Sequence, residues 1–327
     1  RKPYWAQEGK VSITSRINDL HTNYASIMER CRQMDEKVYD DAYKTGGDKY
    51  AEICCAVYRQ VCAAHKLVSD NEGNLLYMSR ENDSGGFINT LDVTYPSQPL
   101  YWIYSPTLAK AMITPILQYA YTGRWNKDWA AHDLGAYPKA NGQTYGDGMP
   151  VEEAGNMLTL LTLIIHLDGD LDYVRKYWKI LGRWADYCYV HGKDPKNQLC
   201  TDDFMGTSER NANLAVKATL GVRSYAALAT MLGQDDVATE YTQKAEEMAE
   251  YWKANAYTTV GGVHYLLNFG ASGSTWSTKY NLIWDQIWGW DLFKEVRTRE
   301  LTYYLNKILK YRILICSLNL LLGMMQR

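Results

Sequence analysis

The chain has 327 residues, and its 35 Lys and Arg against 37 Asp and Glu give a formal net charge of −2, which excludes a strongly basic protein that coats nucleic acid. Hydrophobic residues make up 46% of the chain and charged residues 22%, so it can bury a sizeable core and is not intrinsically disordered. The 27 Tyr and 11 Trp greatly outnumber the 4 Phe, and rings with a polar group suit wet concave sites as well as cores.

Apolar residues at helical spacing, together with Ser-Pro and Gly signals at the ends, predict nine helices. In chain order they are 13–43, 49–65, 105–121, 150–166, 170–190, 208–232, 235–254, 279–293 and 297–310. A turn at 45–48 separates the first two helices. Two short apolar runs around Asn71-Glu72-Gly73-Asn74 predict a β-hairpin over 66–79. The residues around Asp92 are interpreted as a short loop.

The helices are expected to pack as successive pairs. We expect the pairs 13–43 with 49–65, 105–121 with 150–166, 170–190 with 208–232 and 235–254 with 279–293, and the helix at 297–310 opens a fifth pair. Helical hairpins in series predict an all-α fold, an (α/α)6-barrel-like toroid with minor β-hairpins in loops that build one face.

Many sequence signatures of known chemistry are absent. The chain has no Walker A motif, no G-x-G-x-x-G, no H-E-x-x-H and no G-x-S-x-G. Its seven Cys include no C-x-x-C pair and its six His include no i, i+4 pair, so we expect no metal and no cofactor. No signal peptide is visible after Arg1, and the apolar run 313–325 is shorter than the ~20 residues that span a membrane.

Five blocks of the sequence, taken together, resemble the glutaminase A family. They are Asn89–Pro96 (NTLDVTYP), Asp128–Pro138 (DWAAHDLGAYP), Met149–Met157 (MPVEEAGNM), Leu199–Gly206 (LCTDDFMG) and Tyr280–Gly289 (YNLIWDQIWG). The resemblance implies the (α/α)6 barrel of six-hairpin glycosidases and hydrolysis of the side-chain amide of glutamine to glutamate and ammonia. It also implies a periplasmic or secreted location, and we expect a truncated bacterial member.

The chain departs from the family pattern at both ends. Members usually carry a β-rich domain before the barrel, for which this chain has no room. The pattern fades after about residue 311, so we expect a C-terminally incomplete toroid domain over 1–311 and an atypical tail at 312–327 that a frameshift would explain. An incomplete toroid leaves an apolar helix face unpaired, which would favour aggregation or a partner. The oligomeric state stays open.

Carboxylates in the aromatic-rich loops are the candidate catalytic groups, because hydrolysis needs one group that activates water and another that protonates the leaving atom. The candidates are Asp92, Asp133, Glu153, Asp202 and Asp203. Each has a structural alternative. Asp92 could be a turn or cap residue, and Asp133 could bond backbone N–H groups of its own loop. Asp202 and Asp203 could cap a loop, and they are too few to specify a calcium site.

Two consecutive Glu stand in the first turn of the helix at 150–166, where the helix dipole favours acidic residues. They cannot point the same way, and we prefer Glu153 as the inward one because Asn156 and Met157 follow three and four residues on. Further candidates for substrate binding are polar or aromatic residues of the same blocks and loops. They are Asn89, Tyr95, Trp102, Trp129, His132, Tyr137, Glu152, Asn156, Trp276 and Asp285. For Asp285 the stronger alternative is packing among Trp residues with a bond to a neighbouring helix.

The sequence thus favours an amide hydrolase with a small-molecule substrate, glutamine or a saccharide, and no nucleic-acid partner. Two other functions remain. A toroid with paired carboxylates would also serve a glycoside hydrolase. A catalytically incomplete fragment could still bind a carbohydrate or peptide ligand.

Overall fold

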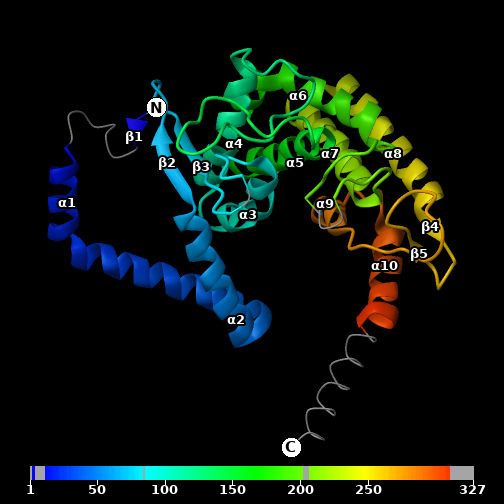
Figure 1. Ribbon diagram of the computed structural model, residues 1–327, viewed down its shortest axis with the longest axis horizontal. Coiled ribbons are helices and arrows are strands. Elements are labelled where there is room, and N and C mark those ends of the chain that lie inside the picture. The colour runs from blue at the N-terminus through cyan, green and yellow to red at the C-terminus, as the bar shows by residue number, and fades with distance from the viewer. Residues whose placement is uncertain (1, 4–11, 84, 202–205, 310–327) are drawn as a thin grey trace, which may run out of the picture. The chain divides into compact units, whose positions relative to one another are not determined.

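The structure is a computed structural model that describes residues 2–3, 12–83, 85–201 and 206–309 (Figure 1). The chain forms two compact units. The first contains residues 1–125 and 131–146, and the second contains 126–130 and 147–327. Helices dominate both units, and the strands form only small antiparallel sheets, which confirms the predicted all-α class with minor β-hairpins. The predicted tail at 312–327 lies outside the described residues.

The first two helices of the first unit are α1 (Ile13–Thr22) and the long α2 (Tyr24–Ala63), which follow each other at Asn23. The backbone of α2 turns at Gly47, whose φ of 75° and ψ of −172° lie outside the helical region and favour glycine. Beyond this turn the chain runs back, so that Arg59 forms an ion pair with Asp35. The predicted turn and the helix that follows it are therefore confirmed, but the helix predicted as continuous over 13–43 is interrupted at Asn23, between α1 and α2.

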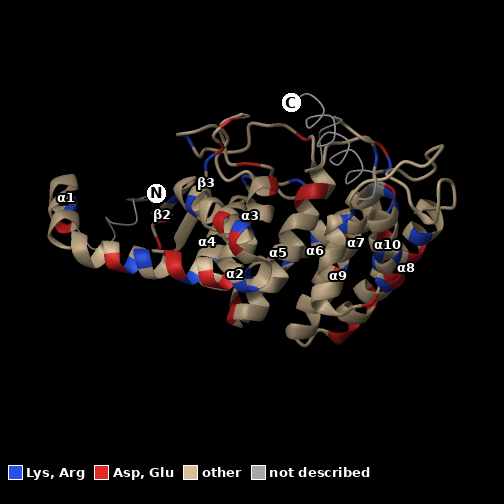
Figure 2. Ribbon diagram, turned by 90° about the horizontal axis from the view of Figure 1, so that it is seen from below, with Lys and Arg blue, Asp and Glu red and all other residues tan. Residues whose placement is uncertain are grey.

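Charge pairs run along the exposed surface of α2. Blue and red segments alternate along this helix (Figure 2), and Arg32 pairs with both Glu29 and Glu36. Such i, i+3 and i, i+4 pairs support a helix by about 0.2–0.5 kcal/mol each. They allow a long helix to remain formed although its buried side chains are few.

A three-stranded antiparallel sheet follows, in the order β1-β2-β3. It consists of β1 (Lys2–Pro3), β2 (His65–Ser69) and β3 (Leu75–Ser79), with His65 opposite Ser79. Asp70 closes the β2–β3 turn by accepting from the backbone N–H and the side chain of Asn74. The predicted hairpin is confirmed, whereas no local pattern predicts β1.

Helix α3 (Leu91–Tyr104) corrects the interpretation of the residues around Asp92 as a loop. Pro96 and Pro99 suggest a helix break because each removes a backbone donor. The helix forms nevertheless, since its buried face packs against α4 (Pro106–Tyr121) and the burial outweighs the lost bonds. The side chains that α3 buries are Leu91, Thr94, Tyr95, Ser97, Gln98 and Tyr101.

The second unit arranges helices in an inner and an outer layer. Its helices are α5 (Pro150–Asp168), α6 (Leu171–Gly192), α7 (Ala212–Met231), α8 (Asp235–Ala256), α9 (Ile283–Trp288) and α10 (Lys294–Tyr303). Nearly every side chain of α5 and α7 is buried, as expected of helices enclosed on all sides. By contrast, α6 and α8 each bury a single stripe of side chains. These two helices therefore form the outer layer of the unit.

The pairing of helices agrees with the prediction in part. Helix α3, which the sequence interpretation missed, packs with α4, and α7 packs against α5, α6 and α8. The predicted pair 170–190 with 208–232 is therefore in contact, whereas the helix at 235–254 packs mainly on α7 rather than on α9, the helix within 279–293. The segments themselves, 150–166, 170–190 and 235–254, are helices close to their predicted bounds.

The helix predicted at 279–293 is shorter than expected. A 3-10 turn (Tyr280–Leu282) leads into α9, which stops at Gly289 with a φ of 61°, the left-handed conformation that ends helices. A small hairpin of β4 (Tyr257–Thr258) and β5 (His264–Tyr265) precedes it. No helix among residues 12–83, 85–201 and 206–309 is long and apolar enough to cross a bilayer.

Glycines allow α5 and α7 to approach closely. A Cβ on Gly221 would lie 3.1 Å from the Cα of Gly155, and a Cβ on Gly155 would lie 2.7 Å from Cγ of Lys217. Gly155 therefore leaves the space through which the Lys217 side chain passes along α5. This close packing places a cation inside the unit, next to the first turn of α5.

Candidate functional site

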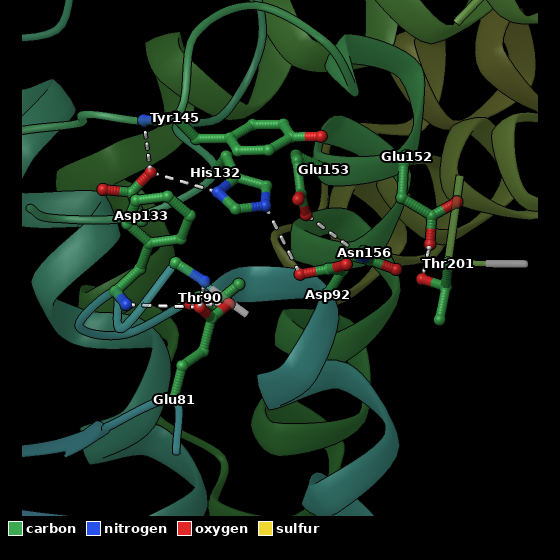
Figure 3. A network of polar contacts seen from close by, with 12 residues as sticks. Glu81, Thr90, Asp92, His132, Asp133, Tyr145, Glu152, Glu153, Asn156 and Thr201 are labelled. Atoms are coloured by element: carbon green, nitrogen blue, oxygen red, sulfur yellow. Dashed lines mark hydrogen bonds and ion pairs between the residues drawn. The ribbon is translucent and has the colours of Figure 1, made fainter. Parts of the chain in front are cut away.

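In the first unit, backbone bonds bring the first turn of α3 beside the loop at 131–146. Ile88 N–H donates to the carbonyl of Gly135, and Leu91 N–H donates to the carbonyl of His132 at 2.7 Å. As a result Nε2 of His132 lies 3.6 Å from Oδ1 of Asp92 (Figure 3). At this distance the groups attract as an ion pair when the imidazole carries both protons, but they do not share a direct hydrogen bond.

Asp133, adjacent to His132, is completely buried and accepts bonds on both oxygens. Oδ1 accepts from the N–H of Gly135 at 2.7 Å and from N–H and hydroxyl of Thr144 at 3.0 and 3.3 Å. Oδ2 accepts from Tyr145 N–H at 3.1 Å and from Nδ1 of His132 at 3.0 Å. Burial alone would raise the pKa of Asp133, but the bonds from His132 and these backbone N–H groups outweigh burial and lower its pKa.

These contacts fix the His132 ring. Because Asp133 is ionised, Nδ1 of His132 carries the proton of their bond, and Nε2 faces Asp92. The Tyr145 ring stacks on the imidazole with centroids 4.0 Å apart, and Phe87 contacts it edge-on at 5.8 Å. The geometry of Asp133 thus matches the structural alternative named for it, a loop-holding carboxylate, and it also orients His132.

Replacing Asp133 by asparagine is expected to lower the free energy of unfolding by about 1–3 kcal/mol at pH 7, since an amide N–H would face backbone donors. The folded pKa of Asp133 lies below its unfolded value of about 3.9. The stabilisation is therefore present above that value and is lost as the pH falls through the folded pKa. Urea unfolding at pH values from 7 to 2 checks whether the difference between wild type and variant shrinks.

The control for this experiment is Asp236→Asn, which changes an exposed carboxylate in the first turn of α8. It should alter stability by less than about 0.5 kcal/mol at every pH. A difference between wild type and Asp133→Asn that stays constant down to pH 2 would contradict the assignment of an ionised, hydrogen-bonded Asp133.

Asn89 offers an uncommitted amide in the same unit. Its side chain is fully buried, its φ of 58° is left-handed, and within the described ranges neither its Nδ2 nor its Oδ1 has a hydrogen-bond partner. Buried amides are almost always paired, so both atoms of this one can still bind a polar group. Glu81 holds the neighbouring backbone by accepting from Phe87 N–H and from the hydroxyl of Thr90.

The other first-unit candidates lie on α3 and in the loop. Tyr95 is buried three residues after Asp92 on α3, and Trp102 is half-buried two turns further on. Tyr137 is exposed, and its ring lies 4.3 Å from the Arg80 guanidinium. The structure therefore brings Asp92 and His132 together, whereas Tyr137 lines a cavity of this unit that neither of them lines.

In the second unit a chain of buried polar groups joins α5 to α7. The Nζ of Lys217 donates to Oε1 of Glu152 at 2.5 Å and to Oδ1 of Asn156 at 2.6 Å. The hydroxyl of Thr201 also donates to Glu152, at 2.5 Å. Asn156 Nδ2 in turn donates to Oε2 of Glu153 at 3.1 Å (Figure 3). Lys217, Glu152, Glu153 and Asn156 are all buried.

This network gives the two glutamates different surroundings. Glu152 is paired with a buried cation, which offsets the cost of burying both charges. Because Lys217 takes the Asn156 oxygen, the amide N–H of Asn156 is directed at Glu153. The sequence interpretation missed Lys217. Its one signal was a Lys within the otherwise uncharged, mainly apolar stretch 214–222 of the helix predicted at 208–232.

The remaining second-unit candidates have contacts of other kinds. Trp129 packs on Tyr187 with centroids 5.1 Å apart, and Trp276 Nε1 donates to Glu300 at 2.9 Å. Asp285 is buried, forms an ion pair with Arg297 and accepts from two backbone N–H groups at 292–293. This is the structural role named as its alternative, and substrate binding by Asp285 stays a prediction. Asp202 and Asp203 lie outside the described residues.

The chemistry available in the first unit is proton transfer. Asp92 supplies a carboxylate that can accept a proton, and His132 supplies an imidazole that can donate one. Both are also types of metal ligand, but two ligands do not specify a metal site.

Comparisons with known proteins identify the domain. The model of the glutaminase A six helical-hairpin domain matches residues 47–317 and therefore extends into the tail that the sequence interpretation set apart. The chain is 30% identical over 307 residues to glutaminase A of Aspergillus oryzae, covering 92% of this chain and 44% of that protein. It is 24% identical over 345 residues to a "probable glutaminase" of Arthroderma benhamiae, covering 88% and 40%.

The chain thus spans less than half the length of these two relatives, which are fungal and give no support to the expected bacterial source. Among solved structures, a glycosidase aligns with a TM-score of 0.36 and 11% identity, over 66% of this chain and 58% of that one.

Proposed function

We propose, from the premise that this chain belongs to the glutaminase A six helical-hairpin family, that it hydrolyses the side-chain amide of glutamine to glutamate and ammonia. The observation that carries the proposal is the arrangement of Asp92 and His132, 3.6 Å apart, with the imidazole held by Asp133. It supplies a base and an acid side by side, which amide hydrolysis requires.

The proposed reaction has two steps. Asp92 accepts a proton from water, the water oxygen attacks the amide carbon, and a tetrahedral intermediate forms. Protonated His132 then donates its Nε2 proton to the amide nitrogen, the carbon–nitrogen bond breaks, and ammonia leaves. The proton on Asp92 returns to His132, so that one water and one glutamine give one glutamate and one ammonia. The sequence interpretation assigned the role of acid to a second carboxylate. In this scheme the acid is the imidazole of His132.

Asn89 supports recognition of an amide or carboxylate. Its buried Nδ2 and Oδ1 can donate to and accept from an amide group of a ligand at the same time. We therefore propose Asn89 as the residue that orients the substrate. Catalytic roles for Glu153, Asp202 and Asp203 stay predictions, and so does a periplasmic or secreted location.

Product analysis tests the proposal. The expected result is release of ammonia and glutamate from glutamine in equal amounts, with no reducing sugar from oligosaccharides. Reducing sugar without ammonia would replace the proposal by the glycoside hydrolase that the sequence also allows. If no substrate is turned over although glutamine raises the melting temperature, the chain is a binding fragment and the proposed activity is wrong.

A further inference from the structure

A cavity of the first unit has a cationic lining and an apolar floor. It has a volume of about 500 Å³ and is lined by residues of β2, β3 and the segment after β3, by Arg124 and by the loop at 137–140. Lys66 lies directly opposite Met78 in the sheet, and Arg80 pairs with Ile88, so these side chains share one face. None of Asp92, His132 and Asn89 lines this cavity, and neither does any acidic residue.

Within the part of the chain that the structure describes, no carboxylate pairs with the three cations that line the cavity, Lys66, Arg80 and Arg124. Other groups hold the arginines. The Arg80 guanidinium lies 4.3 Å from the centre of the Tyr137 ring, and Arg124 Nη2 donates to the carbonyl of Asn141 at 2.6 Å. Their positive charge is therefore positioned but not neutralised.

The acidic side chains that directly follow β2 and the residue after β3 already accept hydrogen bonds from groups outside the cavity. Asp70 accepts from backbone N–H groups of its own turn and from Gln118. Glu81 accepts from the N–H groups of Gly85 and Phe87 and from a hydroxyl. Neither carboxylate is available to neutralise the cavity, so an anion from outside is the natural counter-charge.

We propose that this cavity binds a small organic oxyanion, a carboxylate or a phosphate ester, whose apolar part rests on Met78 and Ile88. The planar edge of an arginine binds such oxyanions through two parallel hydrogen bonds, and the stacked Tyr137 ring keeps the Arg80 guanidinium in place for it. The volume is within the roughly 300–1,000 Å³ of small-molecule sites. The proposal is independent of the proposed hydrolysis, because binding alone tests it.

Isothermal titration with four probes provides the test: 3-phenylpropionate, phenyl phosphate, the neutral 3-phenylpropionamide and inorganic phosphate. We expect at least one of the two aryl anions to bind at least tenfold more tightly than the neutral amide and than inorganic phosphate. The affinity for 3-phenylpropionate compared with the affinity for phenyl phosphate then shows whether the cavity prefers a carboxylate or a phosphate ester.

Variants of the lining arginines complete the test. Arg80→Gln and Arg124→Gln, both exposed positions, should each weaken binding at least tenfold, whereas Arg30→Gln on the exposed surface of α2 should leave it unchanged. The proposal is overturned if neither aryl anion binds, if the neutral amide or inorganic phosphate binds as tightly, or if both lining variants bind like the wild type. Thermal melting of each variant confirms that the fold is retained.

Discussion

The Asp92→Asn variant is expected to lose about 10²–10⁴-fold in kcat for glutamine, with little change in KM. The amide is isosteric with the carboxylate but cannot accept a proton from water, so the proposed base is removed while the shape of the site is kept. Steady-state ammonia release at pH 7 measures the effect. Because Asp92 lies in the first turn of α3, where asparagine is also tolerated, the variant is expected to fold.

A matched control and a double variant separate chemistry from structure. Asp83→Asn alters an exposed aspartate of the same unit and should leave kcat unchanged. If Asp92 and His132 act as one unit, Asp92→Asn combined with His132→Gln should cost little more than either change alone. Full activity of Asp92→Asn, or losses that multiply in the double variant, would contradict the proposed pair.

The Lys217→Met variant is expected to lower the free energy of unfolding by about 3–5 kcal/mol. Methionine fills a similar volume, but it leaves the buried carboxylate of Glu152 without its cation and the oxygen of Asn156 without its donor. Chemical denaturation at pH 7 measures the change. Two polar partners within 2.6 Å of a buried ammonium make this the largest stability effect that we expect from one substitution.

Removing the second charge tests the cause. In Glu152→Gln combined with Lys217→Met no charge remains unpaired, and much of the lost stability should return. Lys253→Met is the control, because Lys253 pairs with Glu250 at the surface of α8 and such pairs contribute about 0–1 kcal/mol. If Lys217→Met lowers the free energy of unfolding no more than this control does, the buried ion pair does not stabilise the fold as its burial implies.

Local signals in the sequence predicted most helices correctly. Helical spacing and end signals located α4, α5, α6 and α8, because the stripe each helix buries and the residues that start it lie within one short window. The turns at Gly47 and Gly73 were also predictable, since the conformation of each depends on a glycine with positive φ. Helix α3 was missed because two prolines in its own sequence argued against it, while the burial that supports it comes from α4.

The candidate site could be predicted only in part. The blocks that carry the family resemblance did contain Asp92, His132 and Asp133, but nothing local distinguished a reacting carboxylate from one that holds a loop. Asp133 accepts bonds from residues 11 and 12 positions away, and only the three-dimensional contacts show that it orients His132. Lys217 contacts Glu152 across 65 residues of sequence, a separation at which no periodic pattern carries information.

The sequence by itself therefore determined the balanced charge, the helical class, the position of most helices and the family resemblance. All of these depend on composition or on residues close together in the chain. The tertiary structure alone decided which helices pack together and which carboxylates form ion pairs with cations. It also decided which buried polar groups of the described residues have no hydrogen-bond partner. These properties depend on partners brought together from distant segments, and the free energy of a buried polar group is set by those partners rather than by its own residue type.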